Sequence, residues 1–158
     1  MFSFTIASGI FLLDYKIKEY VDRTRLQGSQ EEVLGGHLIL RNYHNEDFAF
    51  GKVKLGKENC QELSAAGLGC AFGEYLRQLA HGKNKLGKIG LALVLGGGLS
   101  NYMDRRTKGY VTDYVSFNIK NKDFRKMVFN ISDLCIGAGT LLWVIGGLLP
   151  ANKKSKMD

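Results

Sequence analysis

Hydrophobic and small residues form one long uninterrupted stretch near the end of the chain. Residues 129–149, FNISDLCIGAGTLLWVIGGLL, contain a single ionisable side chain, Asp133, and Pro150 and three lysines follow. A helix needs about 20 apolar residues to cross a bilayer. The pattern therefore predicts a transmembrane helix over residues 129–149. A buried core helix of a soluble protein is the alternative, but a chain of 158 residues rarely needs one of this length.

Two further stretches have the same character. Residues 86–103 include three consecutive glycines, which weaken a helix in water but let helices approach closely in a membrane. A phosphate-binding loop is a weaker interpretation, because no Lys-Ser/Thr pair follows and no strand precedes. Residues 2–22 begin apolar and become amphipathic. They lack the basic start and the small-residue cleavage site of a secretory signal peptide, so they predict a retained first span that contains Asp14.

The segment 63–80 is the most ambiguous of the four. It is rich in small residues but contains Glu74 and Arg77, and alone it resembles a soluble amphipathic helix. We interpret it as a span because an even number of spans places the strand-like segments 34–55 and 109–123 on one side of the membrane. The predicted fold is an all-α membrane protein, with four transmembrane helices and a small β-rich element, in a single domain over residues 1–158.

This connectivity gathers polar residues. The third span must end on the side where the fourth begins, which brings together Asn101, Asp104, Arg105, Asp113, Asn130 and Asp133. An ionisable residue inside a span is a functional hypothesis by default, although a buried carboxylate paired with Arg105 is the alternative for Asp133. Two carboxylates a few ångströms apart share a proton, and such a pair can activate a water. The parity of the spans permits Asp113 and Asp133 to meet without proving it.

Charge and cysteine content exclude other classes of function. The chain has 22 basic and 15 acidic residues, a net charge of +7. Anionic lipids or membrane-flanking loops explain this charge, and no nucleic-acid motif accompanies it, so nucleic acid is not an expected partner. Basic residues lie on both sides of the predicted membrane, so they do not fix the orientation. The spacing of Cys60, Cys70 and Cys135 predicts neither a zinc site nor a disulfide framework.

Several motifs together resemble the lipoprotein signal peptidase family (signal peptidase II). The block GGGLSNYMDRR resembles the family's G-G-A-x-G-N-x-x-D-R, GYVTDY resembles G-x-V-x-D-F/Y, and FNISD resembles F-N-x-A-D. Upstream, LDYKIKEYV resembles L-D-x-x-x-K, and NEDFAFG resembles N-x-G-A-A-F-G. The blocks stand in the family's order over most of the chain. The matching positions are Asp14, Lys18, Asn45, Ala49, Phe50, Gly51, Gly96, Gly97, Asn101, Asp104, Arg105, Gly109, Val111, Asp113, Phe129, Asn130 and Asp133.

The resemblance implies an aspartic endopeptidase of the bacterial cytoplasmic membrane, with four spans and an extracytoplasmic active site. It would remove signal peptides from lipid-modified prolipoproteins by cleaving before the diacylglyceryl-cysteine. By matching position, Asp113 and Asp133 are the catalytic pair. The implied supporting or substrate-binding residues are Asp14, Asn45, Asn101, Asp104, Arg105 and Asn130. The implied partners are prolipoproteins and membrane lipids, the expected state is a monomer, and no metal or cofactor is needed because carboxylates and water suffice.

The chain also departs from the family pattern. Ser132 replaces an alanine beside Asp133, and we expect its hydroxyl to be able to hydrogen-bond that carboxylate. Asp47 and Phe48 replace a Gly-Ala pair in the expected substrate-facing loop, and Ser100 replaces a glycine. These changes leave two alternatives open. One is a divergent paralogue that processes other membrane peptides, and the other is a non-catalytic membrane binding protein.

Overall fold

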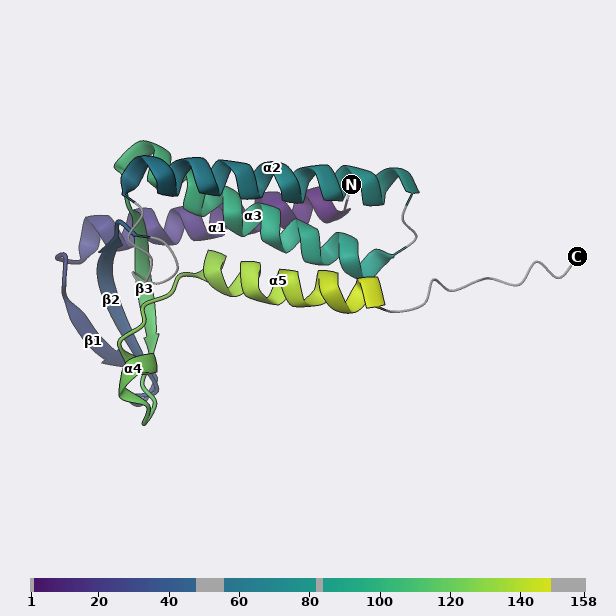
Figure 1. The fold of residues 1–158 in the computed structure, drawn as a ribbon. Helices are drawn as coiled ribbons and strands as arrows, with labels where there is room; N and C mark the ends of the chain where they lie inside the picture. The colour runs from purple at the N-terminus through teal and green to yellow at the C-terminus, as the bar shows by residue number, and fades with distance from the viewer. Residues whose placement is uncertain (1, 48–55, 82–83, 149–158) are drawn as a thin grey trace, which may run out of the picture.

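The computed structural model describes residues 2–47, 56–81 and 84–148. Four long helices dominate it, namely α1 (Phe2–Thr24), α2 (Lys57–His81), α3 (Lys85–Lys108) and α5 (Ile131–Leu148). A small sheet of β1 (Gln30–Val33), β2 (Leu38–Asn45) and β3 (Val111–Phe117) lies at one end of the helices, with the short α4 (Lys122–Arg125) beside it (Figure 1). The mostly helical prediction with a small β-rich element is confirmed.

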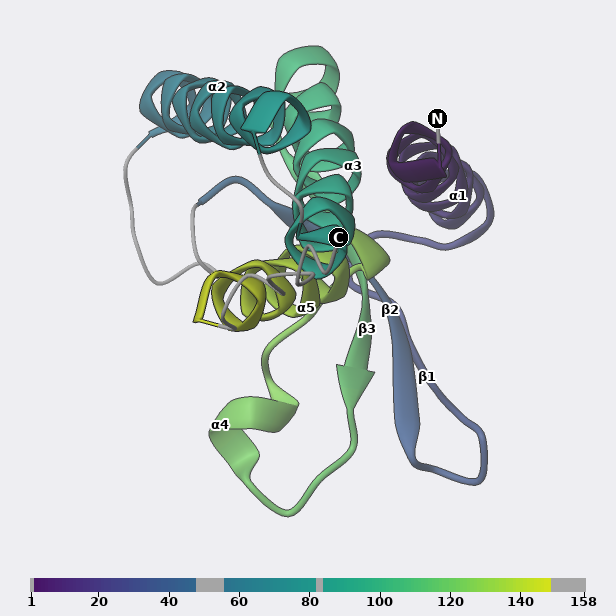
Figure 2. The same ribbon diagram turned by 90° about the vertical axis from the view of Figure 1, so that its right-hand side faces the viewer.

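The helices surround α3. Helices α1, α2 and α5 all pack against it, and α5 makes the most extensive of these contacts. Figure 2 shows α2 and α5 on different sides of α3, with α1 on a third side. Over the described residues, α2 and α5 contact each other far less than either contacts α3. Helix α3 therefore lies at the centre of the helical body and contacts α1, α2 and α5.

Glycines allow the close contact between α3 and α5. A Cβ atom added at Gly90 would lie 2.5 Å from the carbonyl oxygen of Gly139, and one added at Gly139 would lie 2.5 Å from that of Gly90. One added at Gly97 would lie 2.6 Å from the carbonyl oxygen of Ser132. Small residues at such positions let helix backbones approach within a bilayer. These contacts fix the start of α5 against the middle of α3.

A substitution at this contact should separate packing from helix propensity. We expect Gly139→Ala to destabilise the protein by about 1–3 kcal/mol, because the new methyl group meets backbone atoms that cannot give way. Gly137→Ala is the matched control, since a Cβ there meets no atom within 4 Å. Thermal unfolding in detergent measures both. Equal effects of the two substitutions would contradict this role of Gly139.

The sheet positions the link between α3 and α5. Its strands are antiparallel in the order β1-β2-β3, and Tyr43 on β2 pairs with Asp113 on β3. Helix α3 ends at Gly109, whose φ of 80° is a left-handed conformation that suits glycine and lets the chain turn directly into β3. After β3, Phe129 pairs with Val115 in an isolated bridge. The sheet therefore holds both ends of the segment between α3 and α5.

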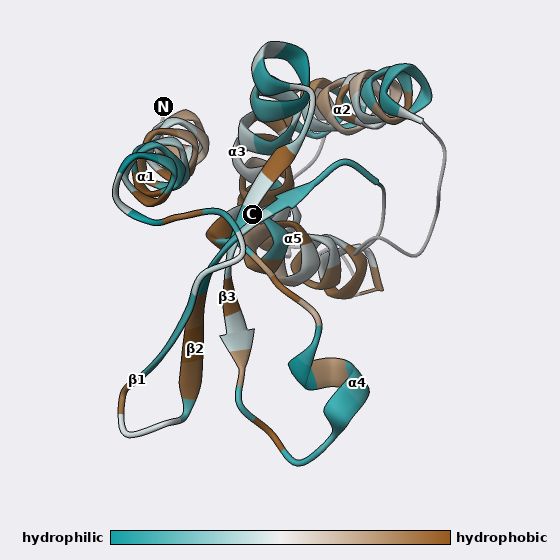
Figure 3. Cartoon of the chain, turned by 90° about the vertical axis from the view of Figure 1, so that its left-hand side faces the viewer, coloured by the Kyte–Doolittle hydropathy of each residue, from teal (hydrophilic) through white to brown (hydrophobic). Residues whose placement is uncertain are grey.

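The interior of the helical body is polar and much of its surface is apolar. Fully buried side chains include Asp14, Lys18 and Asp104, whereas Phe4 and Leu148 are 74% and 79% exposed. Figure 3 shows hydrophobic colour along α5 and hydrophilic colour along β1 and much of α4. Among the described helices, α5 alone is both long and apolar enough to cross a membrane, with a mean hydropathy of 1.6. Large exposed apolar areas indicate contact with a membrane or a partner.

The predicted spans coincide with four helices, but their bounds differ. The third helix continues past residue 103 to Lys108, and the second begins at Lys57 rather than at residue 63. Phe129 was predicted to be helical, which is wrong, because it is bridged to β3 before α5 begins. The hairpin turn lies at residues 34–37, at the start of the predicted strand-like segment 34–55, so β1 precedes that segment. Residues 48–55 of the segment lie outside the described residues.

Candidate active site

Asp113 is held by two asparagine amides. It lies on β3, where its side chain is buried, and Asn45 Nδ2 donates to its Oδ2 at 2.9 Å. Asn130 Nδ2 donates to its Oδ1 at 2.7 Å. Both carboxylate oxygens therefore have a donor from a different segment, one on β2 and one just before α5. This arrangement fixes the orientation of the carboxylate, and no ion pair joins Asp113 to another residue in the part of the chain that the structure describes.

Asp133 lies in the first turn of α5, and the start of that helix orients it. The backbone N–H of Asn130 donates to Asp133 Oδ2 at 3.1 Å, while the N–H of Asp133 donates to Asn130 Oδ1 at 2.8 Å. This reciprocal pattern is that of a helix capping box. From α3, Asn101 Nδ2 donates to Asp133 Oδ1 at 2.9 Å.

Asn130 connects the two carboxylates. Its side-chain amide donates to Asp113 and, at 3.2 Å, to Asn101 Oδ1, while its backbone donates to Asp133. One residue therefore sets the position of both aspartates, and a second amide, that of Asn101, braces the arrangement from α3. Asn130 is itself fully buried, whereas both aspartates line a cavity.

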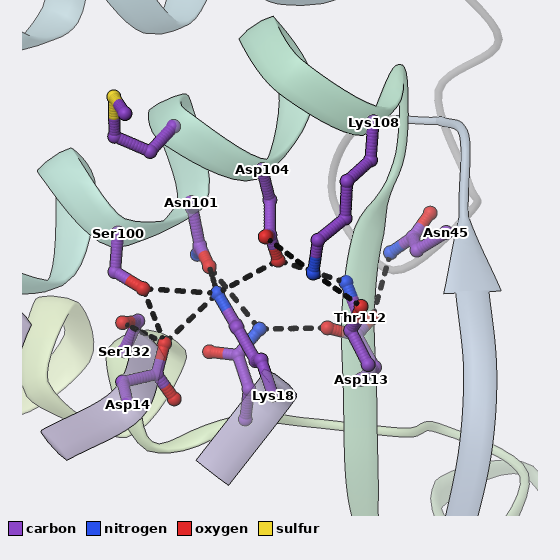
Figure 4. A network of polar contacts seen from close by, with 12 residues as sticks. Asp14, Lys18, Asn45, Ser100, Asn101, Asp104, Lys108, Thr112, Asp113 and Ser132 are labelled. Atoms are coloured by element: carbon purple, nitrogen blue, oxygen red, sulfur yellow. Dashed lines mark hydrogen bonds and ion pairs between the residues drawn. The ribbon is translucent and has the colours of Figure 1, made fainter. Parts of the chain in front are cut away.

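A buried ionic cluster supports the pair from the side of α1. Lys18 Nζ lies 2.8 Å from Asp14 Oδ2 and 3.3 Å from Asp104 Oδ2, and all three side chains are essentially inaccessible to solvent. Lys18 also donates to Asn101 Oδ1 at 2.7 Å, the same amide that holds Asp133 (Figure 4). A buried charge needs both an opposite charge and hydrogen bonds. The cluster meets this need and links α1 and α3 to the aspartate pair.

Asp14 collects further donors from three segments. Ser100 Oγ and Ser132 Oγ donate to its Oδ2 at 2.7 Å and 2.5 Å, and Tyr114 OH donates to its Oδ1 at 2.8 Å. The expectation that Ser132 hydrogen-bonds Asp133 is wrong. Adjacent residues on a helix point in different directions, and Ser132 faces α1 and α3, where Asp14 lies.

Asp104 joins the site to the outer end of α3. The backbone N–H of Thr112 donates to its Oδ2 at 3.1 Å, and Lys108 Nζ lies 2.8 Å from its Oδ1. Lys108 also contacts Asp22 Oδ2 at 2.9 Å. Asp104 therefore acts as a structural anchor that fixes the start of β3, one residue before Asp113.

The two aspartates line one cavity. The cavity has a volume of about 330 Å³ and lies between α2, α3 and α5. Its apolar wall includes Leu63, Leu68 and Ile136, and Arg105 also lines it. Arg105 Nη2 donates to the carbonyl oxygen of Asp47 at 3.4 Å. A mostly apolar cavity with a few convergent polar groups is the usual form of a binding site.

The environment of Asp113 favours its protonated form. Burial away from water, together with the nearby negative charge of Asp133, raises the pKa of Asp113 to about 8. A strongly perturbed carboxyl in a cavity is typical of a functional site, although ionic networks can perturb one as well. Within the described residues, no group of three or more His, Cys, Asp or Glu side chains has the arrangement of a metal site.

The structure brings the predicted site residues into one network in two layers. Asn45, Asn101 and Asn130 contact the aspartate pair directly, and Arg105 lines its cavity. Asp14 and Asp104 lie further away and contact Lys18, which in turn donates to Asn101. Sequence reasoning placed Lys18 on a motif position without a function and expected Ser132 to contact Asp133 instead of Asp14. It gave no function to the other residues of this outer layer, which are Ser100, Lys108, Thr112 and Tyr114. The (i, i+4) spacing of Asp14 and Lys18 on one helix was the available signal.

Comparison with known proteins agrees with this arrangement. A family described as signal peptidase (SPase) II matches residues 6–149. The lipoprotein signal peptidase of Brucella ovis is 34% identical over 134 residues, which are 83% of this chain and 81% of that protein. That of Sphingopyxis alaskensis is 46% identical over 71 residues, 44% of this chain and 40% of that protein.

Two solved structures, both described as bacterial membrane enzymes, have the same fold. One has a TM-score of 0.78 at 24% identity, over 99% of this chain and 93% of that one. The other has a TM-score of 0.76 at 24% identity, over 94% of each chain. The family match covers nearly the whole chain, including every helix that forms the cavity. The chain therefore belongs to the signal peptidase II family.

Proposed function

We propose that this protein is an aspartic endopeptidase that removes signal peptides from lipid-modified prolipoproteins, and that Asp113 and Asp133 are its catalytic pair. One observation carries the proposal. The two carboxylates line the same cavity and are both hydrogen-bonded by Asn130. The relatives named lipoprotein signal peptidase support the choice of substrate. The cut in this proposal falls directly before the diacylglyceryl-cysteine.

The chemistry needs one proton on the pair. The ionised carboxylate takes a proton from a water, whose oxygen attacks the scissile carbonyl carbon, while the protonated carboxyl donates to the carbonyl oxygen. The resulting tetrahedral intermediate collapses, the C–N bond breaks, and the leaving nitrogen takes a proton from the pair. The products are a free carboxyl on the signal peptide and a free amino group on the lipidated cysteine. The pair regains its single proton, and no metal or cofactor enters the cycle.

The neighbouring residues have supporting functions in this scheme. Asn45, Asn101 and Asn130 orient the carboxylates through their amide donors. Asp14 and Asp104 position Lys18, which in turn orients Asn101. Arg105 is suited to hold a substrate carbonyl, because it lines the cavity beside both aspartates.

The proposal also includes an orientation in the membrane. We expect α1, α2, α3 and α5 to span the bilayer as a single domain, with the sheet and the aspartates on the extracytoplasmic side of the cytoplasmic membrane. The buried polar cluster and the exposed apolar side chains of the helices support this placement. Membrane lipids would then contact the helices directly, and a monomer remains our expectation.

Cleavage of matched peptides tests the proposed function. The purified protein should cleave a prolipoprotein peptide that carries a diacylglyceryl group on its cysteine, and mass spectrometry should place the cut directly before that cysteine. The same peptide without the lipid is the control and should be cleaved poorly. Folded protein that cleaves neither peptide would contradict the proposal, and cleavage of both equally would favour a broader peptidase.

The activity should depend on pH in a specific direction. Because the pKa of Asp113 is raised to about 8, the pair keeps its proton below this pH and loses it above. We expect the cleavage rate to fall about tenfold per pH unit above pH 8, because a second ionisation removes the acid. The same carboxyl should make the folded protein lose stability as pH rises from about 4 towards about 8, since folding favours its protonated form. An activity that stays constant above pH 8 would contradict the shared proton.

A further inference from the structure

The cavity that contains the aspartates lies between α2 and α5. Both helices pack on α3, and over the described residues they contact each other far less than they contact α3, which leaves a gap between them. The wall of this gap includes Gly67 of α2, and a Cβ added there would meet no atom within 4 Å. At positions 90, 97 and 139 of α3 and α5, by contrast, backbone atoms of a neighbouring helix occupy the space beside the glycine. Gly67 therefore leaves room for a further chain to lie against α2.

A polar contact between described residues bridges α2 and α5 further from the aspartates. Trp143 Nε1 on α5 donates to Glu74 Oε1 on α2 at 3.2 Å. The same carboxylate accepts two bonds from Arg77, at 2.6 Å and 2.7 Å, and one from Gln78 at 3.0 Å. Glu74 is thus fixed on α2 by its own helix, with a side chain that is 20% exposed, and it is a fixed acceptor for the indole.

The distance from the aspartates to this contact corresponds to a definite length of peptide. Trp143 follows Asp133 by ten positions on the same helix, which is about 15 Å at 1.5 Å per residue. A helical apolar segment of about ten residues would fill this length. The apolar regions of signal peptides range from about 7 to 15 residues, so the shorter ones end before the contact and the longer ones must pass it.

We propose that the Glu74–Trp143 contact closes the inner end of the substrate groove and limits the length of signal-peptide apolar segment that the enzyme accepts readily. This inference rests on the proposed function, in which Asp113 and Asp133 are the catalytic pair. A short segment docks between α2 and α5 with the contact intact. A long one has to break the bond between the indole and the carboxylate before its scissile bond reaches the aspartates.

The test compares two lipidated peptides that differ only in apolar length, about 8 and about 15 residues. Trp143→Phe keeps an aromatic ring but removes the N–H donor. We expect it to lower KM for the long peptide about three- to tenfold, the effect of one hydrogen bond, and to leave KM for the short one unchanged. Glu74→Ala should act in the same way, whereas Glu74→Gln keeps an acceptor and should stay closer to the unmodified protein. Tyr75→Phe, next to Glu74, is the matched control and should change neither value.

Fluorescence gives a second readout that does not need cleavage. Trp143 is the only tryptophan of the chain, so its emission reports directly on this contact. Titration of the Asp113→Asn variant with the long peptide should shift the emission maximum, and titration with the short peptide should not. Equal responses to both peptides, or an equal change of both KM values in Trp143→Phe, would overturn the length limit. Cleavage by Asp113→Asn would instead contradict the catalytic assignment and would leave the length comparison readable.

Discussion

Asp113→Asn and Asp133→Asn are each expected to reduce cleavage of a lipidated prolipoprotein peptide by about 10³-fold or more. An amide at either position can neither take a proton from the attacking water nor give one to the leaving nitrogen. The fold should survive both changes, because asparagine has nearly the same shape and keeps one carbonyl oxygen. At position 113 that oxygen can still accept from Asn130 or Asn45.

A steady-state assay with purified variants measures this effect, and circular dichroism with size-exclusion chromatography verifies the fold. Asp123→Asn is the matched control, since the Asp123 side chain is 96% exposed on α4. It should keep the full rate. Cleavage near the normal rate in a folded Asp113→Asn or Asp133→Asn variant would remove that residue from the catalytic pair.

Lys18→Met is expected to cause the largest loss of stability. Lys18 is the shared cation of two buried carboxylates, Asp14 and Asp104, and its own side chain is fully buried. Removal of one partner from a buried ionic cluster costs about 3–5 kcal/mol, because uncompensated charge remains inside the protein. For a chain of this size, this loss corresponds to a fall of roughly 10 °C in the unfolding temperature.

The control for this change lies two positions away on the same helix. The Lys16 side chain is 72% exposed and pairs only at the surface with Glu19, so Lys16→Met should leave the unfolding temperature almost unchanged. Lys18→Met should also reduce the cleavage rate of any protein that still folds, since Lys18 orients Asn101 and, through it, Asp133. Equal stability of the two variants would contradict the role of Lys18.

The sequence predicted which residues meet in the inner part of the candidate site, because their proximity follows from connectivity and motif spacing. The parity of the spans requires the end of α3 and the start of α5 to meet, and it permits Asp113 to lie between them. The structure has this arrangement, with Asn101 and Asn130 between the carboxylates. The motifs also marked Asp14 and Asp104, but no local pattern states that both contact the same lysine.

The outer part of the site could not be predicted because it depends on side-chain direction across helices. Ser132 is next to Asp133 in sequence, yet its hydroxyl binds Asp14 on another helix. Glu74 made the second span look soluble when read alone. In the structure, the Glu74 carboxylate forms an ion pair with Arg77 and also accepts a hydrogen bond from Trp143, which is far away in the sequence.

The bounds of the helices depend on contacts that the hydrophobic pattern does not contain. Apolar content extends the fourth span back to Phe129, but bridging to Val115 keeps this residue in the sheet layer. The third helix continues past its apolar part to Lys108, where Lys108 and Asp104 contact each other on the outer turn. The hydrophobic pattern locates the third and fourth helices, and polar contacts decide where they begin and end.

The double variant Asp113→Asn/Asp133→Asn tests most directly whether the two aspartates work as one unit. Single-turnover cleavage of the lipidated peptide would be measured in both single variants and in the double variant. If the carboxylates share one proton and act together, replacing the second aspartate should lower the cleavage rate little further. The residual rates of all three variants should then agree within about threefold. A double variant slower than either single variant by a further factor of about 10³ would show that each aspartate acts independently and would contradict the shared-proton pair.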